Sequence, residues 1–221
     1  MSRLLPLFPL QLVVFPGAAV PLHIFEERYR EMVGEAEASG SEFGIVLAKD
    51  GGIVNSGCTV MVQEVLQRYP DGRFDVLTRG QRRFSIVSIN DEKPYLRGEV
   101  EYFGDDTGEP PALELRMRAL EAFERMRQTL ENPGAGRTGA GSTKAEFEPD
   151  VDDPFLSFQL ARMVDDLEFQ NLMQRSRSEA DRLHSFASFM EQYVPQREYM
   201  AKMKRAAPTN GHGHKPASLQ D

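Results

Sequence analysis

Residues 58–89, CTVMVQEVLQRYPDGRFDVLTRGQRRFSIVSI, decide the fold. Two runs rich in β-branched residues flank Asp71-Gly72, a dipeptide that readily supplies the positive φ angles of a tight hairpin turn. We therefore expect one long strand from Cys58 to Tyr69 and a return strand over Arg73–Thr78. The pattern predicts antiparallel pairing, because strands joined by so short a turn run in opposite directions.

Two irregularities lie within this hairpin, and more strands surround it. The alternation of side chains slips between Val62 and Val65, which predicts a β-bulge near Glu64. Gly80 is expected to end the return strand, and a further strand follows over Arg82–Ile89. The other apolar runs of the first half predict strands over Leu4–Phe8, Gln11–Phe15, Val20–Ile24, Glu42–Ala48 and Tyr95–Phe103.

One helix interrupts the strands of the first half. Apolar residues recur at helical spacing between Phe25 and Ala38, and Gly40 ends the pattern. Eight or so short strands with one inserted helix predict a compact, mainly antiparallel barrel or rolled sheet. A parallel α/β sheet would need a helix after nearly every strand, and the sequence lacks the periodicity for those helices.

The second half is predicted to be helical. Helices are expected over Pro110–Leu130 and Asp153–Met163, with further starts at Asp165-x-x-Glu168 and Ser178-x-x-Asp181. Pro195 should kink the last helix or restart it. Residues 132–150 predict a flexible Gly-rich linker, and residues 207–221 a disordered tail. The predicted fold class is α+β, with a β-rich subdomain over 1–105 and a helical bundle subdomain over 106–206.

The composition bounds the function. The chain has 221 residues with 26 basic and 34 acidic side chains, so its formal net charge is −8 and its pI is near 5.2. The acidic excess is divided evenly, with a net charge of −4 on residues 1–105 and −4 on the rest. This balance disfavours a general nucleic-acid binder, which usually carries a basic excess. The single cysteine excludes an internal disulfide and a cysteine-built zinc site.

The early apolar stretch Leu4–Ile24 superficially resembles a secretory signal or a membrane span. Four prolines, Pro6, Pro9, Pro16 and Pro21, argue against both, because each removes a helical hydrogen bond and clashes with the preceding turn. We therefore expect a soluble, cytoplasmic protein that does not contact a membrane.

No catalytic residue, cofactor site or metal site is predicted. Residues 134–139 read G-x-G-x-x-G, but dinucleotide binding needs this motif between a strand and a helix, so a linker is expected there. Cys58 is interpreted as a small buried thiol. His23 is interpreted as a buried histidine with one hydrogen bond, since no nucleophile or set of ligands surrounds it in the sequence.

Three arginines, Arg79, Arg82 and Arg83, surround an expected turn in this acidic protein. Arginine clusters can clamp a carboxylate or a phosphate through two parallel hydrogen bonds. Pairing with neighbouring glutamate and aspartate side chains is the commoner arrangement. Both interpretations stay open at this point.

Several segments occur in an order typical of one family. They are Leu5–Leu10, Val13–Gly17, Pro21–Met32, Phe43–Val46, Gly57–Val60, Pro70–Phe74 and Gly80–Phe84. Together these segments resemble the amino-terminal domain of Lon proteases. The resemblance implies a β-rich, PUA-like module followed by a helical subdomain, which agrees with the patterns above.

The resemblance also implies a function. In Lon proteases this domain recognises or holds the substrate, while an ATPase module and a Ser-Lys protease module do the chemistry. A chain of this length has no room for either module, so we expect a stand-alone, non-catalytic member that recognises exposed apolar or unfolded polypeptide segments. Another protein or a protease system is a further candidate partner. The alternatives are an RNA-binding PUA-like module, a small-ligand-binding protein, and an unrecognised enzyme that uses the cleft between the subdomains.

A groove between the barrel and the bundle is the expected site for an extended apolar peptide. The candidate peptide-binding residues are Phe8, Phe15, His23, Phe25, Glu26, Arg28, Tyr29, Arg82 and Arg83. Packing in the core is the competing interpretation for the aromatic members, since most aromatic residues are core residues first. The charged members could instead fix strand ends to the helix.

Overall fold

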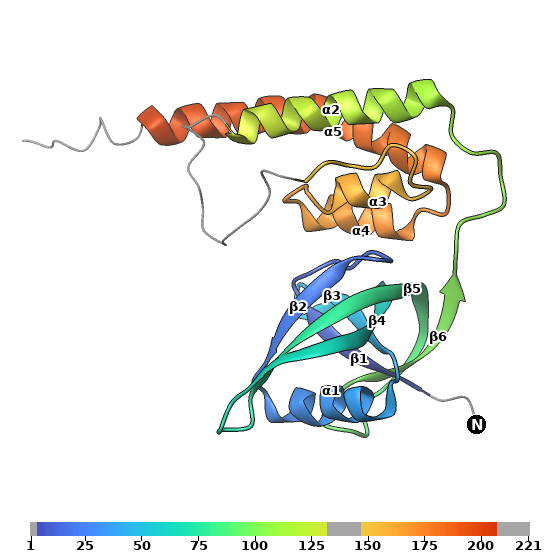
Figure 1. Cartoon of the computed structure of the whole chain (residues 1–221), viewed down its shortest axis with the longest axis vertical. Coiled ribbons are helices and arrows are strands. Elements are labelled where there is room, and N and C mark those ends of the chain that lie inside the picture. Colours follow the sequence, from blue (N-terminus) through green and yellow to red (C-terminus); the bar gives the residue numbers. More distant parts are fainter. Residues whose placement is uncertain (1–3, 132–146, 207–221) are drawn as a thin grey trace, which may run out of the picture.

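The computed structural model of the chain describes residues 4–131 and 147–206. Figure 1 shows a rolled sheet with one helix at its lower end and the other helices stacked above it. Most of the predicted linker, including the G-x-G-x-x-G stretch, and the predicted tail lie outside the described residues. Within the two described ranges, no helix is long and apolar enough to cross a membrane.

Six strands form the sheet, and most pairs are antiparallel. The strands are β1 (Leu5–Leu10), β2 (Ala19–Ile24), β3 (Phe43–Lys49), β4 (Gly52–Arg68), β5 (Phe74–Asn90) and β6 (Arg97–Phe103). Their order is β2-β5-β4-β3-β1-β6, and β5 also pairs with β6, so the sheet rolls up on itself. β1 and β3 pair in parallel, whereas the other ladders of the described strands are antiparallel. The prediction of a mainly antiparallel rolled sheet in an α+β fold is confirmed.

The hairpin of β4 and β5 is the longest feature of the sheet. Its turn follows the expected chemistry, because Gly72 has a φ of 86° and its N–H donates to the carbonyl oxygen of Tyr69 at 3.0 Å. The pairing of β4 with β5 shifts its register between Val62 and Glu64. The predicted bulge near Glu64 is therefore confirmed.

The sheet has fewer strands than predicted, because the chain after β1 folds back onto β5. Gln11–Phe15 is not a strand, and Gly80 does not interrupt β5. The chain after β1 instead folds back onto Gly80, whose N–H donates to the carbonyl oxygen of Ala18 and whose carbonyl oxygen accepts from the N–H of Gly17, both at 2.9 Å. A Cβ atom at position 80 would overlap the carbonyl oxygen of Phe15. Glycine therefore permits a close backbone approach here and does not end the strand.

The variant Gly80→Ala is expected to lower the free energy of unfolding by about 1–3 kcal/mol, the usual cost of inserting a methyl group into a packed site. Urea unfolding followed by circular dichroism measures this change. Gly34→Ala is the matched control, because a Cβ atom on that helical glycine meets no atom within 4 Å. The control should gain about 0.5–1 kcal/mol from its higher helix propensity. Equal stability of the two variants would contradict the prediction.

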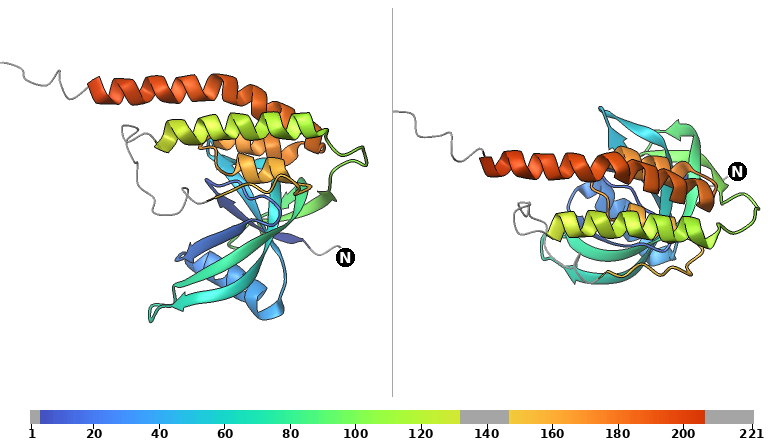
Figure 2. Two further views of the ribbon diagram at one scale, coloured as in Figure 1. Left: turned by 45° about the horizontal axis from the view of Figure 1, so that its top comes forward. Right: turned by 90° about the horizontal axis from the view of Figure 1, so that it is seen from above.

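The helices are α1 (Glu27–Ser39), α2 (Leu113–Glu131), α3 (Leu156–Ala161), α4 (Leu167–Arg175) and α5 (Glu179–Ala206). Figures 1 and 2 show α2 and α5 side by side, running in the same direction, with α3 and α4 between them and the sheet. The ion pair of Arg118 with Glu191, at 3.1 Å, joins the two long helices. The predicted helical bundle is thus present.

The predicted helix boundaries hold in part. Ser178 caps α5 as predicted, because its hydroxyl accepts from the N–H of Asp181 at 3.1 Å. The cap of α4 is Asp166 and not Asp165. α5 continues through Pro195, so the predicted restart at that proline is wrong. α3 is also shorter than predicted and starts at residue 156.

The upper helices and the sheet share one hydrophobic cluster. Val13, Phe15 and Leu47 from the sheet half join buried side chains from α2, α3, α4 and α5. Phe147, at the end of the predicted linker, packs edge-on against Phe123 at 6.4 Å between ring centroids. The predicted boundary between residues 105 and 106 stays a prediction, since the two halves are packed together.

Candidate functional site

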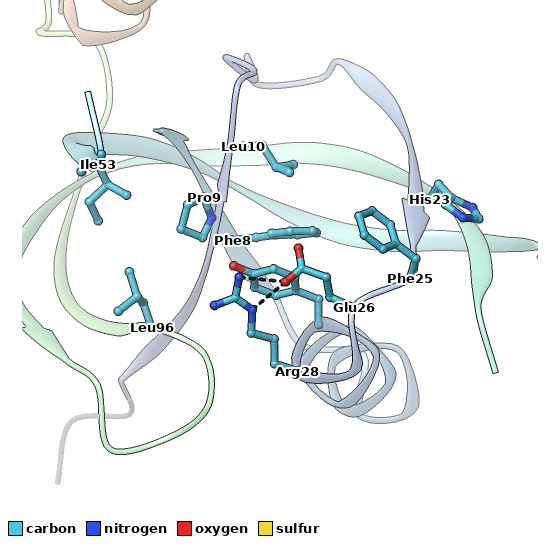
Figure 3. A pocket seen from close by; sticks show the side chains of 12 residues that line it. Phe8, Pro9, Leu10, His23, Phe25, Glu26, Arg28, Ile53 and Leu96 are labelled. Atoms are coloured by element: carbon cyan, nitrogen blue, oxygen red, sulfur yellow. Dashed lines mark hydrogen bonds and ion pairs between the residues drawn. The ribbon is translucent and has the colours of Figure 1, made fainter. Parts of the chain in front are cut away.

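A hollow of about 520 Å³ opens on the sheet where β1, β2 and the start of α1 meet (Figure 3). We call it the aromatic pocket. It is lined by Phe8, Pro9, Leu10, His23, Phe25, Glu26, Arg28, Tyr29, Gly51, Gly52, Ile53 and Leu96. Six of these were candidates from the sequence, namely Phe8, His23, Phe25, Glu26, Arg28 and Tyr29.

Two aromatic rings in close contact, tilted by 31° to each other, form the floor of the pocket. The rings of Phe8 on β1 and Tyr29 on α1 have centroids 4.1 Å apart, and both side chains are buried. The Arg28 guanidinium lies 4.5 Å from the centroid of the Tyr29 ring. Burial raises the pKa of the Tyr29 hydroxyl above its usual value, and Arg28 offsets part of this effect. The floor is thus apolar and keeps Tyr29 neutral.

The start of α1 places a charged pair at the mouth of the pocket. Glu26 has an extended backbone, with φ −72° and ψ 136°, and its side chain makes no capping hydrogen bond. Its carboxylate instead accepts from Nε of Arg28 at 2.9 Å, the pair drawn with dashed lines in Figure 3. The Glu26 carbonyl oxygen accepts from the N–H groups of Tyr29 and Arg30. Because the Glu26 carboxylate does not cap the helix, it is available to hold Arg28 at the mouth of the pocket.

Phe25 and His23 form the outer wall. Phe25 is 59% exposed, which is high for a phenylalanine, and its ring stacks on His23 at 5.9 Å between centroids. His23 Nδ1 lies 2.5 Å from the Asp75 carboxylate, which also accepts from the Tyr69 hydroxyl at 2.8 Å. The hydrogen bond from His23, followed by that from Tyr69, lowers the pKa of Asp75. The prediction that His23 is buried is wrong, because its side chain is 45% exposed on an outer strand.

Carboxylates surround one side of the pocket. A second, shallower hollow is lined by Glu26, Glu27, Arg28, Glu31 and Pro94, and it shares Glu26 and Arg28 with the aromatic pocket. We call Glu26, Glu27 and Glu31 the acidic rim. Lys93 lies 3.3 Å from Glu31 at the far end of this rim.

Three predicted site residues lie outside the aromatic pocket, because Phe15 and Arg83 are packed where the sheet meets the helices and Arg82 lies at the surface. Phe15 is 1% exposed and stacks on Phe158 of α3, with centroids 5.1 Å apart. Arg83 is buried and donates to the carbonyl oxygen of Gln174 at 3.0 Å. Arg82 points to solvent and pairs with Glu42 at 3.0 Å. For these two arginines, pairing with neighbouring acceptors is the arrangement that the structure contains.

The far side of the pocket was not predictable from the sequence. Pro9, Leu10, Ile53 and Leu96 add apolar surface there, beside the Gly51-Gly52 turn. The turn itself was visible in the sequence, and Gly51 has a φ of 77°. Its closeness to β1 was not visible, because it depends on the parallel pairing of β1 with β3.

The cysteine and the groups that could bind a metal ion complete the survey of the described residues. Cys58 is buried, and burial raises the pKa of its thiol to about 12. A thiol with so high a pKa is protonated near neutral pH and is a poor nucleophile. Among the described residues, no three His, Cys, Asp or Glu side chains are placed to hold a metal ion.

The chain is similar to known proteins. The family described as the ATP-dependent protease La (LON) substrate-binding domain matches residues 4–190. The chain is 29% identical over 110 residues to the Lon protease of Parabacteroides distasonis, a match that covers 46% of this chain and 13% of that protein. It is 30% identical over 101 residues to Lon protease 1 of Hydrogenovibrio crunogenus, covering 42% and 12%. The chain therefore matches about an eighth of the length of these relatives.

Two solved structures share the fold. The crystal structure of the Lon N-terminal domain protein from Xanthomonas campestris has a TM-score of 0.64 and 25% identity, and the match covers 85% of this chain and 99% of that chain. The N-terminal domain of the Mycobacterium avium complex Lon protease has a TM-score of 0.60 and 16% identity, covering 86% and 100%. The second similarity supports the fold alone.

Proposed function

The chain belongs to the family of the LON substrate-binding domain, and we propose that it is a non-catalytic recognition module whose aromatic pocket binds exposed apolar segments of unfolded polypeptides. The observation that carries this proposal is the exposed ring of Phe25 beside the Phe8–Tyr29 floor. A cytoplasmic location, and cooperation with a separate ATP-dependent protease, are parts of the same proposal.

The pocket suits an apolar side chain on a polypeptide. A large ring exposed beside a buried apolar floor gains free energy when a second apolar group covers it. Polar groups at the mouth, the Glu26–Arg28 pair and His23, can hydrogen-bond to the backbone of the bound segment. The volume of about 520 Å³ accommodates one or two side chains rather than a folded domain.

The charge around the pocket weighs against an RNA ligand. The acidic rim contributes three carboxylates beside the single guanidinium of Arg28. Phosphate groups need cationic side chains, so a polyanion would be repelled at this surface. A polypeptide carries no such repeating negative charge, and it remains the better ligand class.

The proposal predicts that Phe25→Ser weakens the binding of an apolar peptide about tenfold, as expected when a central aromatic contact is lost. The probe is a fluorescein-labelled ten-residue peptide in which valine and threonine alternate about one phenylalanine, with two lysines at its carboxyl end. Fluorescence anisotropy measures its affinity. The free energy of unfolding should change by less than about 0.5 kcal/mol, because the side chain is largely exposed.

Tyr199→Ser is the control for this experiment. Tyr199 is 61% exposed on α5, a helix that contributes no residue to the lining of the aromatic pocket, so its loss should leave the affinity of the probe unchanged. Wild-type affinity of the Phe25 variant would contradict the assignment of the pocket. A loss of affinity in the Tyr199 variant alone would move the binding site to α5.

A further inference from the structure

The aromatic pocket lies between β1 and β2, whose edges toward the pocket are paired in part or not at all among the described strands. β1 pairs with β3 through Leu7–Leu10. On its other side Leu5 and Pro6 pair with β6, the N–H of Leu7 donates to the carbonyl oxygen of Leu96, and no strand pairing is present from Phe8 to Leu10 among the described residues. β2 pairs with β5 along its whole length and with no second strand of the described chain. Figure 3 shows β1 and β2 on opposite sides of the pocket, with Phe8 and Leu10 pointing into the gap.

The register of β2 shows which backbone groups face this gap. Residues of an edge strand alternate between facing the neighbouring strand and facing away from it. The carbonyl oxygen of Ala18 accepts from the N–H of Gly80 on β5, so Val20 and Leu22 face β5 in the same way. Pro21 and His23 then face the gap. Proline has no N–H group and is tolerated on an edge strand in this orientation. The register therefore directs the backbone N–H donor and carbonyl acceptor of His23 away from β5 and toward the gap.

We propose that the bound segment adds to the sheet as an extended strand along β2, with an apolar side chain over the Phe8–Tyr29 floor and a basic side chain at the acidic rim. This mode rests on the proposed function and specifies it further. Main-chain hydrogen bonds to His23 would give affinity for many sequences, because every polypeptide backbone carries the same groups. The floor and the rim would add the preference for apolar and basic side chains.

Charge complementarity determines the kind of segment. Glu26, Glu27 and Glu31 lie along one rim, and Arg28 and Lys93 neutralise only part of their charge. A lysine or arginine that follows the apolar side chain would lie against the remaining carboxylate of the acidic rim, that of Glu27. An acidic side chain at the same place would be repelled.

Amide methylation of the probe peptide tests the backbone pairing on the unaltered protein. A set of probes each carries one N-methyl group at a successive amide, and anisotropy gives the affinity of each. In an added strand every second amide donates to β2, so methylation of those amides should weaken binding about tenfold. Methylation of the intervening amides should weaken binding by less than about twofold. A uniform or patternless response would overturn strand addition. It would leave the pocket proposal intact if the unmethylated probe binds.

Two protein variants provide a second readout. His23→Pro removes the backbone donor, whereas His23→Ala removes the same side chain and keeps the donor. We expect about tenfold weaker probe binding for the proline variant relative to the alanine variant, at equal far-ultraviolet circular dichroism. Equal affinities of the two variants would overturn the proposal. Should His23→Pro fail to fold, the methylation series decides alone.

Exchange of the two lysines of the probe for glutamates tests the acidic rim. We expect about tenfold weaker binding at low salt and a smaller difference at 1 M salt, because salt screens exposed charges. Equal binding at low salt would remove the basic preference from the proposal. If no probe binds at all, the proposed function itself fails.

Sedimentation tests whether the edge of β2 binds a second copy of the chain. Self-association that His23→Pro abolishes would assign the edge to that second copy and overturn the proposal.

Discussion

Replacing Arg182 by methionine is expected to lower the free energy of unfolding by about 3–5 kcal/mol, the usual cost of removing one partner from a buried ion pair. Arg182 lies at the start of α5 with a side chain that is 0% exposed. It donates to both oxygens of Asp105, to Glu179 and to the hydroxyl of Ser157, at 2.5–2.7 Å. Its guanidinium also lies 4.2 Å from the ring centroid of Phe158.

The loss is large because the partners remain buried after the cation is gone. The Glu179 side chain is 8% exposed and that of Asp105 is 20% exposed, so water solvates neither carboxylate well. Burial alone would raise the pKa of Asp105, but hydrogen bonds and charge from Arg182 and Arg83 outweigh it, and the pKa lies below its usual value. Arg83 on β5 shares Asp105 with Arg182, so the cluster joins the sheet to the helices.

Arg118→Met is the matched control for this variant. Arg118 pairs with Glu191 between α2 and α5, but the two side chains are 52% and 62% exposed. An exposed pair contributes about 0–1 kcal/mol, so this variant should unfold at nearly the wild-type urea concentration. Urea unfolding followed by circular dichroism compares the two variants at neutral pH. Similar midpoints for both would show that the buried cluster contributes no more than a surface ion pair.

Local signals were sufficient to predict the elements of the fold, whereas contacts between distant segments were not visible in the sequence. The turn at Asp71-Gly72 and the helix after Phe25 depend on turn chemistry and on periodicity, which a short window contains. The role of Gly80 depends on the chain near Phe15 folding back onto β5. No short window contains that contact, so the glycine was mistaken for the end of a strand.

The two adjacent arginines illustrate the same limit. Successive side chains of a strand point to opposite faces, so Arg82 and Arg83 must have different surroundings once they lie in β5. Arg82 pairs at the surface with Glu42, and Arg83 is buried beneath the helices with Asp105. The break expected at Gly80 placed these arginines around a turn, where side chains do not alternate between two faces. The sequence therefore indicated one cluster of like charges.

The candidate site was predictable where its residues are neighbours in the chain. His23 to Tyr29 form one continuous segment from β2 into α1, so a single motif contains much of the pocket. Phe8 comes from a separate segment, and its aromatic ring made it a candidate wall of the expected groove. Leu96 and Ile53 come from other segments and carry no signal of their own, since isolated aliphatic residues occur throughout the sheet.

Phe15→Ala is expected to lower the free energy of unfolding by about 3–5 kcal/mol, the range for removing a buried phenylalanine from a core. Phe15 is 1% exposed and belongs to the cluster that joins the sheet to the helices. Its ring stacks on Phe158 with centroids 5.1 Å apart, so truncation leaves a cavity between the two halves. The rigid hydrogen bonds around Gly80 hold the backbone there and limit collapse into that cavity.

The same variant separates a packing role from a binding role. Phe15 was a candidate for the peptide site, but the structure places it in the sheet–helix core, so the folded fraction of Phe15→Ala should bind the probe peptide with wild-type affinity. Phe25→Ser should show the opposite behaviour, with wild-type stability and weakened binding. Urea unfolding and anisotropy on both variants therefore form a double test. Weakened binding of Phe15→Ala at unchanged stability would return Phe15 to the site and contradict its assignment to the core, because a side chain that packs there cannot be lost without a cost in stability.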